Sequence, residues 1–134
     1  ERRRDHIAAG RSFVMETVFS HPSKLALLQD ARDAGYRIIV FHLALASADL
    51  AVARVTARID EGGHPVPEEK IRQRFDRNAP LIRRAALLAD RAMIFNASAL
   101  NERPAVLLEL AQGQVVRRAG EVPEWFEGLY GYLF

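Results

Sequence analysis

The stretch Ala53–Phe75, ARVTARIDEGGHPVPEEKIRQRF, contains two helical patterns that carry arginines on either side of a break. Arg54 and Arg58 lie four residues apart in the first pattern and therefore share one helix face. The break itself is Gly62-Gly63-His64-Pro65, a combination that favours a turn between helices. The second pattern carries three more arginines: Arg72, Arg74 and Arg77.

Arginine suits phosphate, because a guanidinium is planar, stays charged and donates paired hydrogen bonds. Two helices that meet at a Gly-Gly turn can bring arginines from both arms onto one anionic group. The stretch therefore predicts a lid that closes over phosphate, with residues 53–80 forming the lid and its flanking helices. The alternative is a pair of solvated helix faces joined by a loop, which the same charge pattern also fits.

The composition indicates one domain with a core of its own. The chain has 134 residues, of which 49% are hydrophobic, and a formal net charge of +2. That charge is too small to indicate a nucleic-acid partner by itself. The absence of cysteine excludes disulfides and thiolate chemistry. No apolar run approaches the roughly 20 residues of a membrane helix, and no signal peptide opens the chain, so we expect a cytoplasmic protein.

Three apolar runs predict strands: Ser12–Thr17, Arg37–Leu45 and Arg91–Asn96. The second run is nearly continuous in apolar residues, which is typical of a parallel strand covered on both faces. Helical patterns separate the three runs. This alternation predicts an α/β fold with an open sheet and right-handed crossovers.

The expected helices have recognisable starts. One follows Pro22, and Ser47 caps another with Asp49 in its first turn. A third opens at Pro67-Glu68-Glu69, and Pro80 is expected to kink or restart it. Residues 104–134 then predict a hairpin, which turns at Gln112-Gly113, and a tail helix.

Polar residues follow the predicted strands at the edge where open α/β sheets bind ligands. Glu16 and Thr17 end the first strand, where a carboxylate is costly unless it is paired or exposed at a site. They predict a substrate grip by hydrogen bonds, or a strand end that simply turns to solvent. The other two strand ends are Ala46-Ser47 and Asn96-Ala97-Ser98.

Several other kinds of site find no support in the sequence. His42 is expected to be a core histidine, and His64 either contacts a phosphate or lies on a surface loop. No pair of histidines has metal-ligand spacing, so no metal site on protein ligands is predicted. The chain contains no GxSxG elbow. It also lacks the phosphate-binding loop GxxxxGK[ST], because its two lysines, Lys24 and Lys70, follow Ser and Glu.

Three segments are similar to a known family: SFVMETVFS at Ser12–Ser20, AGYRIIVFHLAL at Ala34–Leu45 and VARVTARIDEGGHPVPEEKIRQRF at Val52–Phe75. In this order and spacing the chain resembles the zeta-toxin family of P-loop kinases, particularly its small bacterial members, over roughly Ala9 to Ser98. The resemblance implies a three-layer parallel sheet with a helical lid, and ATP and Mg²⁺ as cofactors. It implies phosphorylation of a small molecule, such as UDP-N-acetylglucosamine, and a small antitoxin protein as a partner.

The resemblance also implies roles for single residues. Glu16 and Thr17 match the strand-end pair that grips the acceptor. Arg58 matches the lid arginine before the break, and Arg72 or Arg74 matches the one after it. In phosphoryl transfer such arginines position and neutralise the phosphate rather than form covalent bonds.

Four further residues are expected on the nucleotide side of the site. Arg54 and His64 would add to the phosphate contacts from the lid. Asn96 and Ser98 would flank the adenine, although related proteins tend to read Asp-Asn-Ser at this place.

The family's P-loop and its catalytic aspartate should precede Glu1. We therefore expect residues 1–134 to be a single partial domain, the carboxy-terminal two-thirds of a kinase domain, which is inactive alone. The P-loop strand belongs between the strands at Ser12–Thr17 and Arg37–Leu45. Because unpaired backbone there is costly, we expect other residues, another chain or a rearranged pairing to fill the gap.

Two other functions remain open. A non-catalytic relative would bind a nucleotide or a partner without transferring phosphate, and GxxxxGK[ST] upstream in the gene would distinguish the two. A nucleic-acid binder is disfavoured by the small net charge and the lack of a set of stacking aromatics. We expect neither a nucleic-acid nor a membrane partner.

Overall fold

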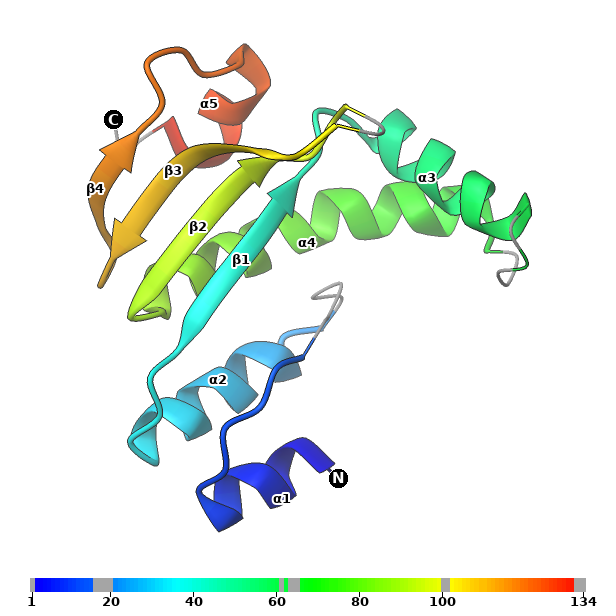
Figure 1. Cartoon of the computed structure of the whole chain (residues 1–134). Helices are drawn as coiled ribbons and strands as arrows, with labels where there is room; N and C mark the ends of the chain where they lie inside the picture. The colour runs from blue at the N-terminus through cyan, green and yellow to red at the C-terminus, as the bar shows by residue number, and fades with distance from the viewer. Residues whose placement is uncertain (1, 16–20, 61, 63–65, 100–101, 132–134) are drawn as a thin grey trace.

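The computed structural model describes residues 2–15, 21–60, 62, 66–99 and 102–131, which form a mixed α/β fold. Figure 1 shows a twisted sheet with helices packed behind and below it, and a helical hairpin that extends beyond one end of the strands. The elements in chain order are α1 (Arg2–Ala9), α2 (Ser23–Asp33), β1 (Ile39–Ala44), α3 (Ala48–Asp60), α4 (Glu68–Leu88), β2 (Arg91–Asn96), β3 (Ala105–Ala111), β4 (Gln114–Arg118) and α5 (Glu124–Tyr130).

The sheet has the order β1-β2-β3-β4 and is mixed rather than parallel. β1 runs parallel to β2, with Ile39 opposite Arg91, whereas β2, β3 and β4 are antiparallel neighbours. The predicted parallel sheet is therefore wrong beyond β1 and β2. The connection from Asn96 to Ala105 is too short for the crossover that a parallel neighbour needs, so β3 must return antiparallel. The predicted turn at Gln112 and Gly113 joins β3 to β4, with φ values of 50° and 78°.

The strand predicted at Ser12–Thr17 does not form over residues 12–15, and Glu16 and Thr17 lie outside the described residues. Val14 is 97% exposed, so the middle of this apolar run is not buried. A strand needs a neighbour for its backbone hydrogen bonds, and no strand of the described chain pairs with this segment. The apolar run alone was an insufficient signal.

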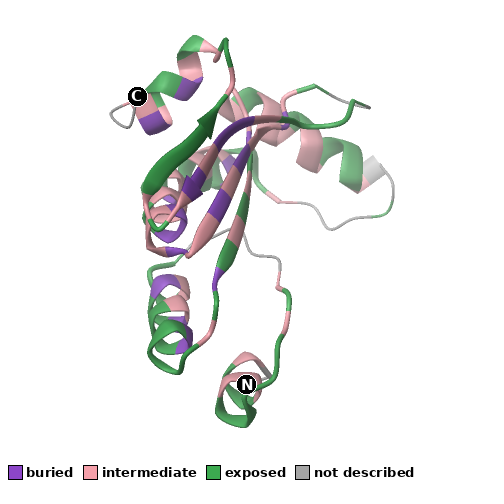
Figure 2. Cartoon of the chain, turned by 60° about the vertical axis from the view of Figure 1, so that its left-hand side comes forward, coloured by how far each residue is buried: buried purple, intermediate pink, exposed green. Residues whose placement is uncertain are grey.

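The core lies on one face of the sheet, where α4 and α5 cover it. Ile94 of β2 and Leu108 of β3 are fully buried there, opposite each other in the antiparallel register. Phe126 and Tyr130 of α5 pack into the same cluster, one helical turn apart. Figure 2 shows buried residues along the central strands and on the helices that lie beside them.

The other face of the sheet is open. Ile39, Phe41 and Leu43 alternate along β1 and are 53%, 64% and 59% exposed, because no helix of the described chain packs on their side (Figure 2). The prediction was three layers, with helices on both faces of the sheet. The described residues form two layers, which are the sheet and the helices on one of its faces. The outer edge of β1 is also free of a described neighbour (Figure 1).

Candidate functional site

The predicted lid residues lie on a hairpin of α3 and α4 that extends from the carboxyl end of β1 (Figure 1). Ser47 caps α3 as predicted, since its Oγ accepts a hydrogen bond from the Leu50 N–H at 3.4 Å. Glu68 and Glu69 occupy the first turn of α4, where the helix dipole favours negative charge. α4 continues through Pro80 as one helix and does not restart there.

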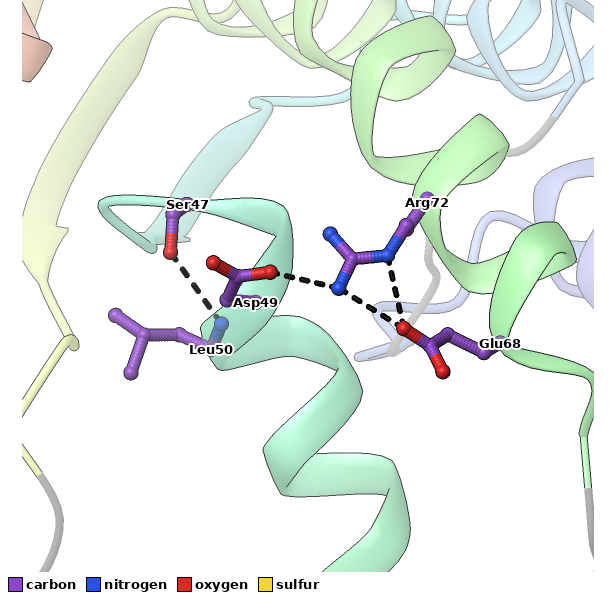
Figure 3. Close-up of polar contacts among 5 residues, drawn as sticks. All are labelled: Ser47, Asp49, Leu50, Glu68 and Arg72. Carbon is purple, nitrogen blue, oxygen red and sulfur yellow. Dashed lines mark hydrogen bonds and ion pairs between the residues drawn. The ribbon is translucent and has the colours of Figure 1, made fainter.

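Arg72 of α4 is held by two carboxylates (Figure 3). Its Nη2 lies 2.6 Å from Asp49 Oδ1, which comes from the first turn of α3, and 2.9 Å from Glu68 Oε1. Its Nε donates to the same Glu68 oxygen at 3.1 Å. The hydrogen bonds to Asp49 and then to Glu68 raise the pKa of Arg72 above its ordinary value. The sequence predicted Arg72 as a phosphate ligand but did not identify the two acids that hold it.

Arg54 lies at the carboxyl end of the sheet and turns inward. Its Nη2 donates a hydrogen bond to the carbonyl oxygen of Ala97, the residue that follows β2. Its Nε is buried and meets no acceptor among the residues the structure describes. The predicted nucleotide-side residue Arg54 therefore ties α3 to the loop after β2.

Asn96 and Ser98 lie in the same loop and organise it. The Ser98 Oγ accepts a hydrogen bond from the Ala46 N–H at 2.9 Å, and the Asn96 Oδ1 accepts one from the Ser98 N–H at 3.1 Å. The Ala97 N–H adds a bond to the Ala44 carbonyl at 2.8 Å. Three predicted residues from two separate segments, Arg54 on one and Asn96 and Ser98 on the other, thus meet at the carboxyl ends of β1 and β2.

The other predicted residues are not part of this cluster. Arg58 lies one turn beyond Arg54 on α3, and Arg74 lies two residues beyond Arg72 on α4; both are exposed. Neither makes an ion pair within the described ranges. Glu16, Thr17 and His64 lie outside the described residues.

His42, predicted as a core histidine, is half-buried on β1 and bonded to the tail helix. Its Nδ1 lies 2.8 Å from the Tyr130 hydroxyl of α5. Burial lowers the pKa of His42 from 6.5 to about 4, so the imidazole is neutral near pH 7. The contact joins the tail helix to β1. His42 therefore has a packing role and is not part of the candidate site.

A hollow in the surface lies at the opposite end of the sheet from these residues. It encloses about 620 Å³ and is lined by Arg37, Asp90, Arg91 and the β3–β4 turn. Asp90 is already engaged, since it accepts a hydrogen bond from the Ile38 N–H at 2.7 Å. Arg91 is paired with Glu109. In an open α/β sheet ligands bind at the carboxyl ends of the strands. This rule favours the end of the sheet where Arg54 lies and from which the hairpin with Arg72 extends.

The residues present fit a phosphate better than they fit a metal. Two helix arms offer four arginines: Arg54, Arg58, Arg72 and Arg74. Across the described part of the chain, no three His, Asp or Glu side chains gather in a way that could hold a metal ion. The 134 residues also contain no glycine-rich loop with a lysine to cradle a triphosphate. None of the helices within the described ranges is long and apolar enough to cross a bilayer.

The sequence matches a protein-family model over most of its length. A family model described as Zeta toxin matches residues 3–105, which include β1, the α3–α4 hairpin and β2. The searches of curated proteins and of solved structures found no match.

Proposed function

Because the chain belongs to the zeta toxin family, whose members are kinase-like phosphotransferases that use ATP, we propose that it carries the lid and the acceptor side of such an enzyme. The observation that supports this most directly is the α3–α4 hairpin, whose two arms bear arginines beyond the carboxyl end of β1. Phosphoryl transfer requires positioning and charge neutralisation above all, and arginines on two arms can provide both.

Each residue has a proposed task. Arg58, Arg72 and Arg74 neutralise the phosphate during transfer. Glu16 and Thr17 hold the acceptor by hydrogen bonds. Four residues contact the nucleotide: Arg54, His64, Asn96 and Ser98. ATP with Mg²⁺ supplies the phosphoryl group, and the acceptor is a small molecule, with a nucleotide sugar such as UDP-N-acetylglucosamine as the first candidate.

In this proposal the phosphate loop comes from residues outside these 134, since the motif does not occur among them. The open side of β1 supports this proposal. Phe41 and Leu43 are 64% and 59% exposed, and a further strand and its helix would bury them. We therefore propose that these 134 residues alone do not transfer phosphate, and that the full gene product does. Family membership also makes an antitoxin protein a candidate partner, in the cytoplasm.

A second candidate is a non-catalytic relative that binds a nucleotide or a partner protein without transferring phosphate. One observation favours the partner-binding form: Arg54, Asn96 and Ser98, the residues proposed for the nucleotide side, already make internal hydrogen bonds, which suffice to explain why they lie at the strand ends. Such a protein would show no turnover with any acceptor, and its partner-binding form would bind no Mg-ATP.

Replacing Arg58 with alanine in the full gene product tests the kinase proposal. Turnover should fall about a hundredfold or more, because an arginine that stabilises transferring phosphate contributes at least that much. Arg84→Ala is the matched control, since Arg84 is also exposed on α4 but lies ten residues beyond Arg74, outside the predicted lid. Turnover that Arg58→Ala leaves unchanged would rule out the role of Arg58.

A further inference from the structure

The contacts of Arg72 occupy the part of its side chain that a phosphate needs. A guanidinium can donate a paired hydrogen bond through two edges, Nε with Nη2 or Nη1 with Nη2, and both edges include Nη2. Here Nη2 faces Asp49 at 2.6 Å and Glu68 at 2.9 Å, while Nε donates to Glu68 at 3.1 Å. Only single hydrogen bonds from Nη1 remain for another anion (Figure 3).

The charge around Arg72 also opposes an incoming phosphate. Two carboxylates surround one guanidinium, so the three side chains together carry a net negative charge. The raised pKa of Arg72 keeps it protonated beside these acids. Arg72 therefore cannot be released by losing its proton, and it can reach a phosphate only by exchanging one anionic partner for another.

The two ion pairs are weak enough to be exchanged. The side chains of Arg72, Asp49 and Glu68 are 42%, 79% and 62% exposed, and exposed ion pairs are screened by water and salt. A polyphosphate carries more charge than one carboxylate and offers paired oxygens to the arginine fork. It can therefore displace the acids, but part of its binding free energy is lost in doing so.

We propose that Asp49 and Glu68 form an acidic clasp that withholds Arg72 until an incoming nucleotide displaces them. The proposal rests on the proposed function, because nucleotide phosphate is the ligand there assigned to Arg72. The clasp also joins the two arms of the hairpin, since Asp49 lies on α3 and Glu68 and Arg72 lie on α4. When phosphate binds Arg72, the contact between Asp49 and Arg72 that joins the two arms is broken as well. The clasp is therefore an autoinhibitory contact.

The test measures Mg-ATP affinity by calorimetry in the full gene product, with the isosteric double variant Asp49→Asn/Glu68→Gln. We expect the affinity to rise about three- to tenfold, the range expected for losing two exposed ion pairs. Glu69→Gln is the matched control. Glu69 lies in the same first turn and bonds only to Gln73, at 3.4 Å among the described contacts, so its neutralisation should leave the affinity within about twofold.

Arg72→Ala completes a double-mutant cycle. In the Arg72→Ala background the Asp49→Asn/Glu68→Gln variant should give no gain in Mg-ATP affinity, because the two acids then have no arginine to hold. Unchanged affinity in the double variant, or the same gain with and without Arg72, overturns the clasp while leaving the proposed function in place. Unchanged affinity on Arg72→Ala alone overturns the role proposed for Arg72, and the clasp with it. A gene product that binds no Mg-ATP overturns the proposed function and the clasp together.

Discussion

The two faces of the sheet differ sharply although the same strands supply both. On one face Ile94 is fully buried beneath α4 and α5, and on the other Ile39 is 53% exposed two positions from Phe41 at 64%. Apolar side chains are distributed over both faces, but helices are present on only one. The difference indicates that the covered face holds this chain together, whereas the open face is suited to contacts with residues outside the 134.

Phe41→Ala should have very different effects on the free energy of unfolding of the 134-residue chain and of the full gene product. In the 134-residue chain the change should alter the free energy of unfolding by no more than about 0.5 kcal/mol, because the ring is largely in water. In the full gene product it should cost about 3–5 kcal/mol, as expected for a buried phenylalanine. Urea unfolding of both proteins measures the effect. A small loss in both would show that nothing covers the open face.

A matched pair of isoleucines tests the faces within the chain itself. Ile94→Ala should lower the free energy of unfolding by about 2–5 kcal/mol, because it opens a cavity in the core. Ile39→Ala on the adjacent strand should cost about 0.5 kcal/mol or less. Both values come from urea unfolding of the 134-residue chain. Equal losses at the two positions would contradict the assignment of the core to one face.

His42 makes the covered face sensitive to acid. The folded protein binds a proton on His42 only near pH 4, whereas the unfolded chain binds one near 6.5. Its contribution to stability is therefore complete above pH 6.5 and is lost as the pH falls towards 4, by about 3 kcal/mol in all. In His42→Asn, which keeps a polar atom near Tyr130, this part of the pH dependence should disappear. An unchanged slope between pH 6.5 and 4 would contradict the role of His42.

The covered half of the fold could be predicted from the sequence because its signals are local. Apolar runs and helix-start residues located β1, β2, α2, α3 and α4, and the short turn at Gln112-Gly113 located the hairpin. The strand at Ser12–Thr17 could not be judged in this way, because a strand depends on a neighbour that the run itself does not reveal. The buried pair Phe126 and Tyr130 was not singled out, since the tail helix is short and apolar on more than one side.

The candidate site was predictable in its location and not in its contacts. Strand ends and arginine spacing pointed to Arg54, Asn96 and Ser98, which the structure brings to one loop. Glu68 was identified only as a helix-start residue, although its position four residues before Arg72 was a usable signal for an ion pair. Asp49 reaches Arg72 from the other arm of the hairpin. That contact depends on how α3 and α4 pack, which spacing along one helix cannot show.

The most direct test of the central claim is calorimetric titration of Mg-ATP into two proteins, the full gene product and the 134-residue chain. Our account predicts that the full gene product binds Mg-ATP and that the shorter chain does not, because these residues supply the lid arginines without a phosphate loop. Binding by neither protein, or equal binding by both, would contradict it.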